Sequence, residues 1–236
     1  MKQFAVFDID GTLIRWQLYH AVVDRLAKTG ALGTGVDHDI HEARMKWKRR
    51  EGTDGFYAYE RVLIDLYDKA VSTLDPKEFD ATTNTIINEY RDQVYTYTRD
   101  LVKKFKNESY VLLAISGSQK ELVAKIAEHY GFDDYIATDY ARTKDGFSGE
   151  VSVASHDKKS ALDILIAKHN LTLAGSYAVG DSKSDAAMLA MVENPIAFNP
   201  DKNLFDEAKK QGWKIVLERK NMIYELESNN GTYILV

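Results

Sequence analysis

Apolar residues along this chain follow two different spacings. Continuous apolar runs of three to six residues are typical of strands buried on both faces of a sheet. Between the runs, apolar residues recur at every third or fourth position, as they do in helices that bury one face. Because runs and helical segments alternate, we predict an α/β fold with a parallel sheet covered on both faces. The runs lie at residues 4–7, 110–115, 135–137, 177–180, 195–198 and 213–217.

A long helical segment follows the first run and contains no convincing strand. Leu18, Val22 and Leu26 recur at every fourth residue, and Gly30 is placed to stop that helix. We therefore expect a bundle of helices over residues 15–99, inserted into a sheet domain made of residues 1–14 and 100–236. Further helices of the bundle are expected near Asp37, after Thr53 and from Asp75, and Asp-Gly and Asn-Gly pairs at 145–146 and 230–231 predict two β-hairpins.

Three of the apolar runs end in polar residues. Asp8 and Asp10 follow the first run, Ser116 follows the second, and Asp181 and Asp185 follow the run at 177–180. Side chains alternate across a strand, so Asp8 and Asp10 are expected on the same side. In parallel α/β folds, ligands bind beyond the carboxyl ends of the strands. The polar run ends therefore predict one shared site.

Carboxylates at such a site repel each other, by about 4 kcal/mol at 4 Å where the effective dielectric constant is near 20. A divalent cation, a lysine or protonation of one acid would offset this repulsion. Asp8 and Asp181 are oxygen ligands of the kind that Mg2+ prefers. Ser116, with backbone N–H groups at the start of the following helix, is suited to hold phosphate oxygens. Lys158, at the start of its own helix, would add positive charge.

Each of these groups also has a purely structural interpretation. An Asp-x-Asp-Gly stretch is typical of a turn after an edge strand, and residues 116–118 are typical of a helix N-cap. Asp181 and Asp185 are also suited to cap a helix, and lysines such as Lys158 and Lys159 are mostly solvated. Their order along the chain and their common position at strand ends and helix starts favour the shared site.

Composition excludes several classes of function. The 236 residues carry a net charge of −5, so nucleic acid is not expected as a partner of the whole molecule. The absence of cysteine excludes disulfides, thiolate nucleophiles and cysteine-based zinc sites. No signal peptide and no apolar stretch long enough to span a bilayer is visible. We therefore expect a cytoplasmic protein without a membrane partner.

The chain resembles the haloacid dehalogenase (HAD) superfamily of phosphatases, whose four motifs occur here in order. Residues 7–13 match the first motif, residues 115–117 the second, and residues 179–185 the fourth, while a lysine before a helix matches the third. The helical insertion between the first two motifs resembles the cap of the phosphoserine phosphatase-like branch. The resemblance implies a Rossmann-like (HAD-like) core with an inserted α-helical cap domain.

The resemblance also implies roles for individual residues. Asp8 corresponds to the nucleophile that forms an aspartyl-phosphate, and Asp10 to the general acid that protonates the leaving group and then activates water. Asp8, the backbone carbonyl of Asp10, and Asp181 would hold Mg2+, with Asp185 in a supporting position. The residues expected to bind the phosphoryl group are Thr12, Ser116, Gly117 and Lys158.

The implied function is Mg2+-dependent hydrolysis of a small phosphorylated metabolite. Lys158 fits the third motif better than Lys159, because the leucines that follow it have the spacing of the branch. Gln17 replaces the glutamate with which phosphoserine phosphatases bind the substrate's ammonium group, which argues against serine phosphate. Arg61 either aligns with their substrate-binding cap arginine or is a solvated helix residue.

Two other functions remain compatible with the sequence. One is a phosphotransferase of the same fold, and the other is a non-catalytic regulatory protein that binds a phosphorylated ligand. The oligomeric state is also open, because the C-terminal hairpin either extends the sheet or pairs with another subunit.

Overall fold

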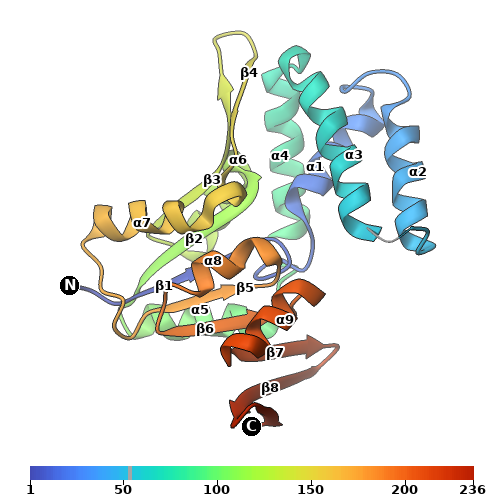
Figure 1. The fold of residues 1–236 in the computed structure, drawn as a ribbon. Helices are drawn as coiled ribbons and strands as arrows, with labels where there is room; N and C mark the ends of the chain where they lie inside the picture. Colours follow the sequence, from blue (N-terminus) through green and yellow to red (C-terminus); the bar gives the residue numbers. More distant parts are fainter. Residues whose placement is uncertain (53–54) are drawn as a thin grey trace. The chain divides into compact units, whose positions relative to one another are not determined.

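The computed structural model describes residues 1–52 and 55–236 of the chain. Its strands form a sheet in the order β4-β3-β2-β1-β5-β6-β7-β8-β9 (Figure 1). Neighbouring strands from β3 to β7 are parallel, whereas β4, β8 and β9 pair antiparallel. The predicted α/β fold with a mostly parallel sheet is confirmed. The strands are β1 (Phe4–Phe7), β2 (Val111–Gln119), β3 (Asp134–Arg142), β4 (Phe147–Ser152), β5 (Tyr177–Gly180), β6 (Asn194–Phe198), β7 (Lys214–Arg219), β8 (Met222–Asn229) and β9 (Thr232–Leu235).

Helices connect the strands and form the insertion after β1. All the helices predicted between residues 18 and 90 are present, although Thr53, after which the third was predicted, lies outside the described residues. Asp75 caps its helix as predicted, because its Oδ1 accepts a hydrogen bond from Lys77 N at 2.9 Å. The α-helices are α1 (Leu18–Thr29), α2 (Val36–Lys48), α3 (Gly55–Ala70), α4 (Pro76–Tyr90), α5 (Thr96–Asn107), α6 (Lys120–Tyr130), α7 (Lys158–His169), α8 (Ala186–Leu189) and α9 (Lys202–Gln211).

The central strands are buried on both faces. Phe7 packs edge-on against Phe105 of α5, with ring centroids 6.3 Å apart. On the other face, Val6 belongs to a buried cluster with Leu162 and Leu165 of α7. Figure 1 shows α5 on one side of the sheet and α7, α8 and α9 on the other. Burial on both faces explains why these strands are continuous apolar runs in the sequence.

The register of the sheet aligns the ends of three strands. Phe7 of β1 pairs with Ala114 of β2 and with Val179 of β5. Directly after this level, Asp8 N donates to the Val179 carbonyl at 2.9 Å. The residues that follow β1 and β5, and the outer part of β2, therefore share one edge of the sheet.

The chain divides into two compact units. Unit 1 consists of Met1–Trp16, Tyr90–Thr138 and Val153–Val236, and unit 2 of Gln17–Glu89 and Asp139–Ser152. Unit 2 thus contains α1 to α4, which belong to the predicted helical insertion. It also takes in the outer part of the β3–β4 hairpin, Asp139–Ser152, which the sequence pattern did not assign to the helical domain.

The hairpin packs on α4 within unit 2. Arg142 donates to both carboxylate oxygens of Asp80, at 2.6 and 3.2 Å. Its guanidinium also lies 5.3 and 5.1 Å from the ring centroids of Phe79 and Phe147. An ion pair and the cation–π contact with Phe79 therefore join the hairpin to α4, while the contact with Phe147 lies within the hairpin.

One local prediction needs correction, and one short helix was not predicted. The helix expected directly after residues 116–118 begins only at Lys120, because β2 continues through Gln119. Ser118 N donates to Ser116 Oγ at 3.0 Å, so a local side-chain bond replaces the expected first turn of helix. The short helix α8 was not predicted, since four residues are too few to show a helical period.

Within the described residues, none of the helices has both the length and the apolar character needed to cross a membrane.

Candidate active site

Three carboxylates lie together at the carboxyl ends of β1 and β5. Asp8 follows β1, and Asp181 and Asp185 follow β5, with one oxygen of each lying within 4.8 Å of the others. Asp8 and Asp185 are buried and Asp181 is half-buried. The sequence prediction that these strand ends meet is therefore confirmed for the acids. Three oxygen donors at this spacing are suited to bind a hard divalent cation.

Lys158 lies between two of the acids. Its Nζ donates to Asp8 Oδ1 and to Asp185 Oδ1, both at 2.6 Å, and its side chain is 2% exposed. The lysine is placed by the start of α7, where the Asp157 side chain accepts a hydrogen bond from Ser160 N. Lys159 instead is exposed and lies 3.5 Å from Asp163. The two adjacent lysines thus differ in their surroundings: Lys158 is buried between acids, whereas Lys159 is exposed.

The crowding of acids changes their titration. Burial raises the pKa of the Asp8 carboxyl to about 7; Lys158 opposes this rise, while Asp185 and Asp10 add to it. The pKa of Asp181 lies well above its usual value, because of burial first and then of Asp8 and Asp185. Burial lowers the pKa of Lys158, but its two carboxylate partners raise it further, so the lysine stays charged. One ammonium thus faces three carboxylates, and a further cation would relieve the repulsion.

Asp185 is held by contacts to both of its oxygens. Oδ2 accepts hydrogen bonds from the backbone N–H groups of Asp181 and Ser182, at 3.1 and 2.9 Å, and Oδ1 binds Lys158. These contacts fix the loop that carries Asp181. They suit Asp185 to the supporting position expected from the sequence.

Asp10 and the predicted phosphate-binding residues lie next to the acids. Ser116 Oγ donates to Asp10 Oδ2 at 2.9 Å, and both residues are buried. Thr12 Oγ1 lies 3.4 Å from Asp181 Oδ1. Gly117 is exposed, and a Cβ built there would lie 3.2 Å from Ser155 Oγ. The structure therefore brings residues from the first, second and fourth motifs into contact.

Two glycines make the close approach of these loops possible. Gly11 has φ +83°, and a Cβ at this position would collide with the Asp181 carboxylate. A Cβ at Gly180 would collide with the Asp185 side chain. Any larger residue at either position would push the acids apart.

Sequence reasoning missed a residue that holds the first-motif loop. Thr98 of α5 is fully buried, and its Oγ1 donates to the backbone carbonyl of Thr12 at 2.8 Å. Nearby, Tyr95 N donates to the carbonyl of Leu13 at 3.1 Å. No local signal marks Thr98, because its partner is 86 residues away.

The two predicted specificity residues belong to unit 2. Gln17 is half-buried and directly precedes α1, and its side chain makes no capping hydrogen bond. Arg61 lies on the exposed part of α3. Their roles toward a substrate remain predictions.

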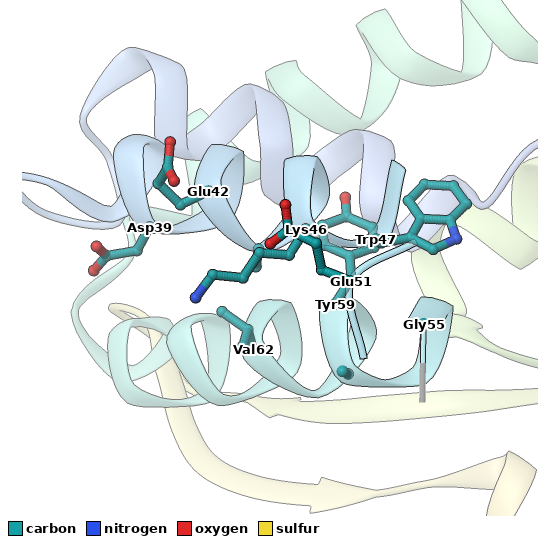
Figure 2. A pocket seen from close by; sticks show the side chains of 10 residues that line it. Asp39, Glu42, Lys46, Trp47, Glu51, Gly55, Tyr59 and Val62 are labelled. Carbon is teal, nitrogen blue, oxygen red and sulfur yellow. The ribbon is translucent and has the colours of Figure 1, made fainter. Parts of the chain in front are cut away.

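Unit 2 also contains a pocket of about 410 Å3 between α2 and α3. Figure 2 shows the Lys46 side chain of α2 extending toward Val62 of α3, and Glu42 and Asp39 of α2 also line the pocket. Trp47 and Tyr59, whose rings stack with centroids 5.6 Å apart, form part of its wall. The lining includes none of the site residues predicted from the sequence.

Comparisons with known proteins agree with this arrangement. The family model of haloacid dehalogenase-like hydrolases matches residues 5–190. A histidinol-phosphatase of Neisseria meningitidis serogroup C (strain 8013) is 27% identical over 228 residues, which cover 92% of this chain and 99% of the relative. A phosphoserine phosphatase of Methanocaldococcus jannaschii is 26% identical over 212 residues, or 84% of this chain and 85% of the relative. A solved structure of a protein with unknown function from Bordetella pertussis Tohama I shares the fold, with a TM-score of 0.71, 23% identity, and coverage of 91% of this chain and 98% of that chain.

Proposed function

This chain belongs to the haloacid dehalogenase-like hydrolases, in their phosphoserine phosphatase-like branch, and from that membership we propose that it hydrolyses the phosphate monoester of a small metabolite with Asp8 as nucleophile. The observation that carries the proposal is the buried contact of Lys158 with Asp8 and Asp185 beside Asp181. A nucleophilic carboxylate, a fixed ammonium and a cation-binding group of acids are what phosphoryl transfer requires.

In the first step, a carboxylate oxygen of Asp8 attacks phosphorus. The new O–P bond gives an aspartyl-phosphate, and the bond from phosphorus to the leaving oxygen breaks. Asp10 gives its proton to that oxygen, so an alcohol leaves. Lys158 offsets part of the negative charge of the phosphoryl group.

In the second step, water attacks the phosphorus of the aspartyl-phosphate. Asp10, now ionised, takes a proton from the water, and the bond between phosphorus and Asp8 breaks. Inorganic phosphate and the original carboxylate result. One residue serves both proton transfers, since the group that protonates the leaving oxygen is then ionised and ready to act as a base. Ser116 keeps the Asp10 carboxyl in place through its hydrogen bond.

The residues present fit a divalent cation. Asp8 and Asp181 offer carboxylate oxygens at ligand spacing, and burial among like charges raises the pKa of both acids. Mg2+ suits this donor set, because it is commonly held by one or two carboxylates together with water and substrate phosphate. When bound, the cation would neutralise charge on the phosphoryl group, and the backbone carbonyl of Asp10 would complete the protein ligands.

The substrate we propose is a small phosphorylated metabolite, without further identity. The two curated relatives are named for different substrates, histidinol phosphate and phosphoserine. Gln17 and Arg61, in the helical insertion, are the residues that we propose contribute to this choice.

The decisive experiment replaces Asp8 by asparagine. Asp8→Asn has nearly the same shape but no nucleophilic carboxylate, so turnover of p-nitrophenyl phosphate with Mg2+ should fall at least about 1,000-fold. Asp163→Asn is the matched control, because this exposed acid lies on α7 and pairs with the exposed Lys159. Thermal unfolding of both variants checks that they fold.

Two results would contradict the proposal. Retained turnover in Asp8→Asn would remove Asp8 as nucleophile. Phosphate release much smaller than substrate consumption, in the presence of an alcohol acceptor, would favour a phosphotransferase instead.

A further inference from the structure

The strand β9 ends the sheet with an open edge. It stands last in the strand order and pairs antiparallel with β8. Within the described residues, no strand lies on its other side. The backbone N–H and C=O groups along such an edge are available to pair with another chain.

The two edges of the sheet differ in how they are protected. β4, at the other end of the strand order, carries Glu150 and a left-handed Gly149, and its pairing with β3 is irregular. Charges, glycines and irregular pairing of this kind discourage contact with other strands. β9, in contrast, contains no charged residue, proline or glycine between Thr232 and Leu235. Its edge therefore lacks the charge, the glycine and the irregular pairing that protect β4.

Exposed apolar side chains gather on the β8–β9 hairpin. Six of the thirteen exposed large apolar residues of the described chain lie there or directly after it, and three of the six are in β9 or next to it. They are Met222, Ile223, Tyr224, Ile234, Leu235 and Val236, with 39–64% of their surface exposed.

The hydrogen-bond pattern of the hairpin fixes which backbone groups face outward. Val236 N donates to the Glu225 carbonyl at 2.9 Å, and these two residues are opposite each other in the register of β8 and β9. In an antiparallel strand, the N–H and C=O groups of one residue both point to the strand on one side, and those of the next residue both point to the other side. Ile234, like Val236, therefore faces β8. Tyr233 and Leu235 direct their N–H and C=O groups to the open edge.

We propose that β9 pairs antiparallel with β9 of a second copy of this chain, around a two-fold axis through Ile234. In this register, Tyr233 of each copy exchanges backbone hydrogen bonds with Leu235 of the other. Ile234 meets its own copy, and Thr232 lies opposite Val236. Opposed residues lie on the same face, so apolar side chains meet at Ile234 and in the two pairs of Tyr233 with Leu235.

The charge distribution fits a second copy as the occupant. Side chains of β9 are uncharged, so the two-fold axis brings no like charges together. The two acids of β8, Glu225 and Glu227, share the ammonium of Lys214, at 2.7 and 3.3 Å. These charges lie at least one strand spacing, about 4.8 Å, behind the edge. A second copy of this chain therefore supplies both the backbone hydrogen bonds and the apolar contacts of this register, and no other protein is needed.

Sedimentation velocity over a range of concentrations tests the proposal. Wild-type protein should form a dimer, and Ile234→Lys, which places two lysines on the axis, should raise the dissociation constant at least about tenfold. Met222→Lys is the matched control: it adds the same charge at another exposed residue, on β8 and away from the seam, and should leave the dimer intact. An equimolar mixture of Ile234→Lys and Ile234→Asp should restore the dimer, because opposite charges then meet on the axis.

Three results would overturn the proposal. They are wild-type protein that stays monomeric up to about 100 μM, an Ile234→Lys variant that still forms the wild-type dimer, and a Met222→Lys variant that dissociates equally. The measurement does not depend on turnover, so a failure of the phosphatase proposal and a failure of the dimer proposal are distinguishable.

Discussion

Lys158 is buried in contact with two acids, and this arrangement is stable only while all three groups are present. Removing an ammonium from water costs several kcal/mol, which contacts of 2.6 Å to two carboxylates offset. Asp185 is 0% exposed, and the exposure of Asp8 is 5%. Loss of the lysine would therefore leave carboxylates buried without their cation.

We predict that Lys158→Met lowers the free energy of unfolding by about 3–5 kcal/mol in EDTA, because buried charges lose their partner. Urea unfolding measures this change. Lys159→Met, the matched control on the adjacent exposed residue, should change the free energy of unfolding by less than about 0.5 kcal/mol. Added Mg2+ should recover part of the loss in Lys158→Met, since it replaces the missing positive charge. Equal effects of the two substitutions would contradict the assignment of Lys158.

The sequence predicted the acids of the site because their spacing is local. Asp8 and Asp10 directly follow an apolar run, and strand alternation and sheet geometry are enough to place them at one edge. Ser116 was predicted at a helix start, yet it lies in β2 and donates to Asp10. That contact depends on the extension of β2 beyond its apolar run, which no hydrophobic pattern records. Thr98 was missed for a similar reason, since only the folded chain brings it to Thr12.

The start of α5 has a structural role that its sequence does not reveal. Glu218 of β7 accepts hydrogen bonds from the backbone N–H groups of Thr96 and Tyr97, at 3.0 and 2.8 Å. An acidic side chain at a helix N-terminus satisfies donors that have no partner within the helix. In the same first turn, Thr98 binds the first-motif loop. The helix therefore connects β7 to that loop.

We predict that Thr98→Val lowers the free energy of unfolding by about 1–3 kcal/mol, because the buried Thr12 carbonyl loses its donor. If Thr98 positions the loop for phosphate binding, KM for p-nitrophenyl phosphate should rise more than kcat falls. Thr98→Ser keeps the hydroxyl and should restore both KM and most of the stability. Thr96→Val, at an exposed residue of the same turn, is the control. A rise in KM in Thr98→Ser equal to that in Thr98→Val would contradict the role of the hydroxyl.

The arrangement of the whole chain was predictable where it depends on alternation of strands and helices. The apolar runs predicted the core strands, and their alternation with helices predicted the parallel sheet. The association of Asp139–Ser152 with the helices of unit 2 was not predictable, because it depends on long-range contacts such as Arg142 with Asp80. A hairpin signal gives the turn but not the surface on which the hairpin packs.

The acids of unit 1 should make the stability of the protein depend on Mg2+. A ligand at 100 times its dissociation constant stabilises the folded state by about 2.7 kcal/mol. For a chain of this length, that corresponds to a rise in Tm of roughly 5–10 °C. Calorimetry with Mg2+ and with EDTA measures the shift, without any need for turnover.

Asp181→Asn should raise Tm in EDTA but reduce the rise in Tm that Mg2+ causes. Its pKa is raised well above the usual value, so the charged form destabilises the fold near neutral pH, and a neutral amide should raise Tm in EDTA. The same substitution removes a cation ligand, so the rise in Tm on adding Mg2+ should be largely lost. Asp145→Asn, at an exposed acid of the β3–β4 turn, should keep the wild-type response. A wild-type Tm that does not respond to Mg2+, or an Asp181→Asn variant with the full response, would contradict a metal site formed by these acids.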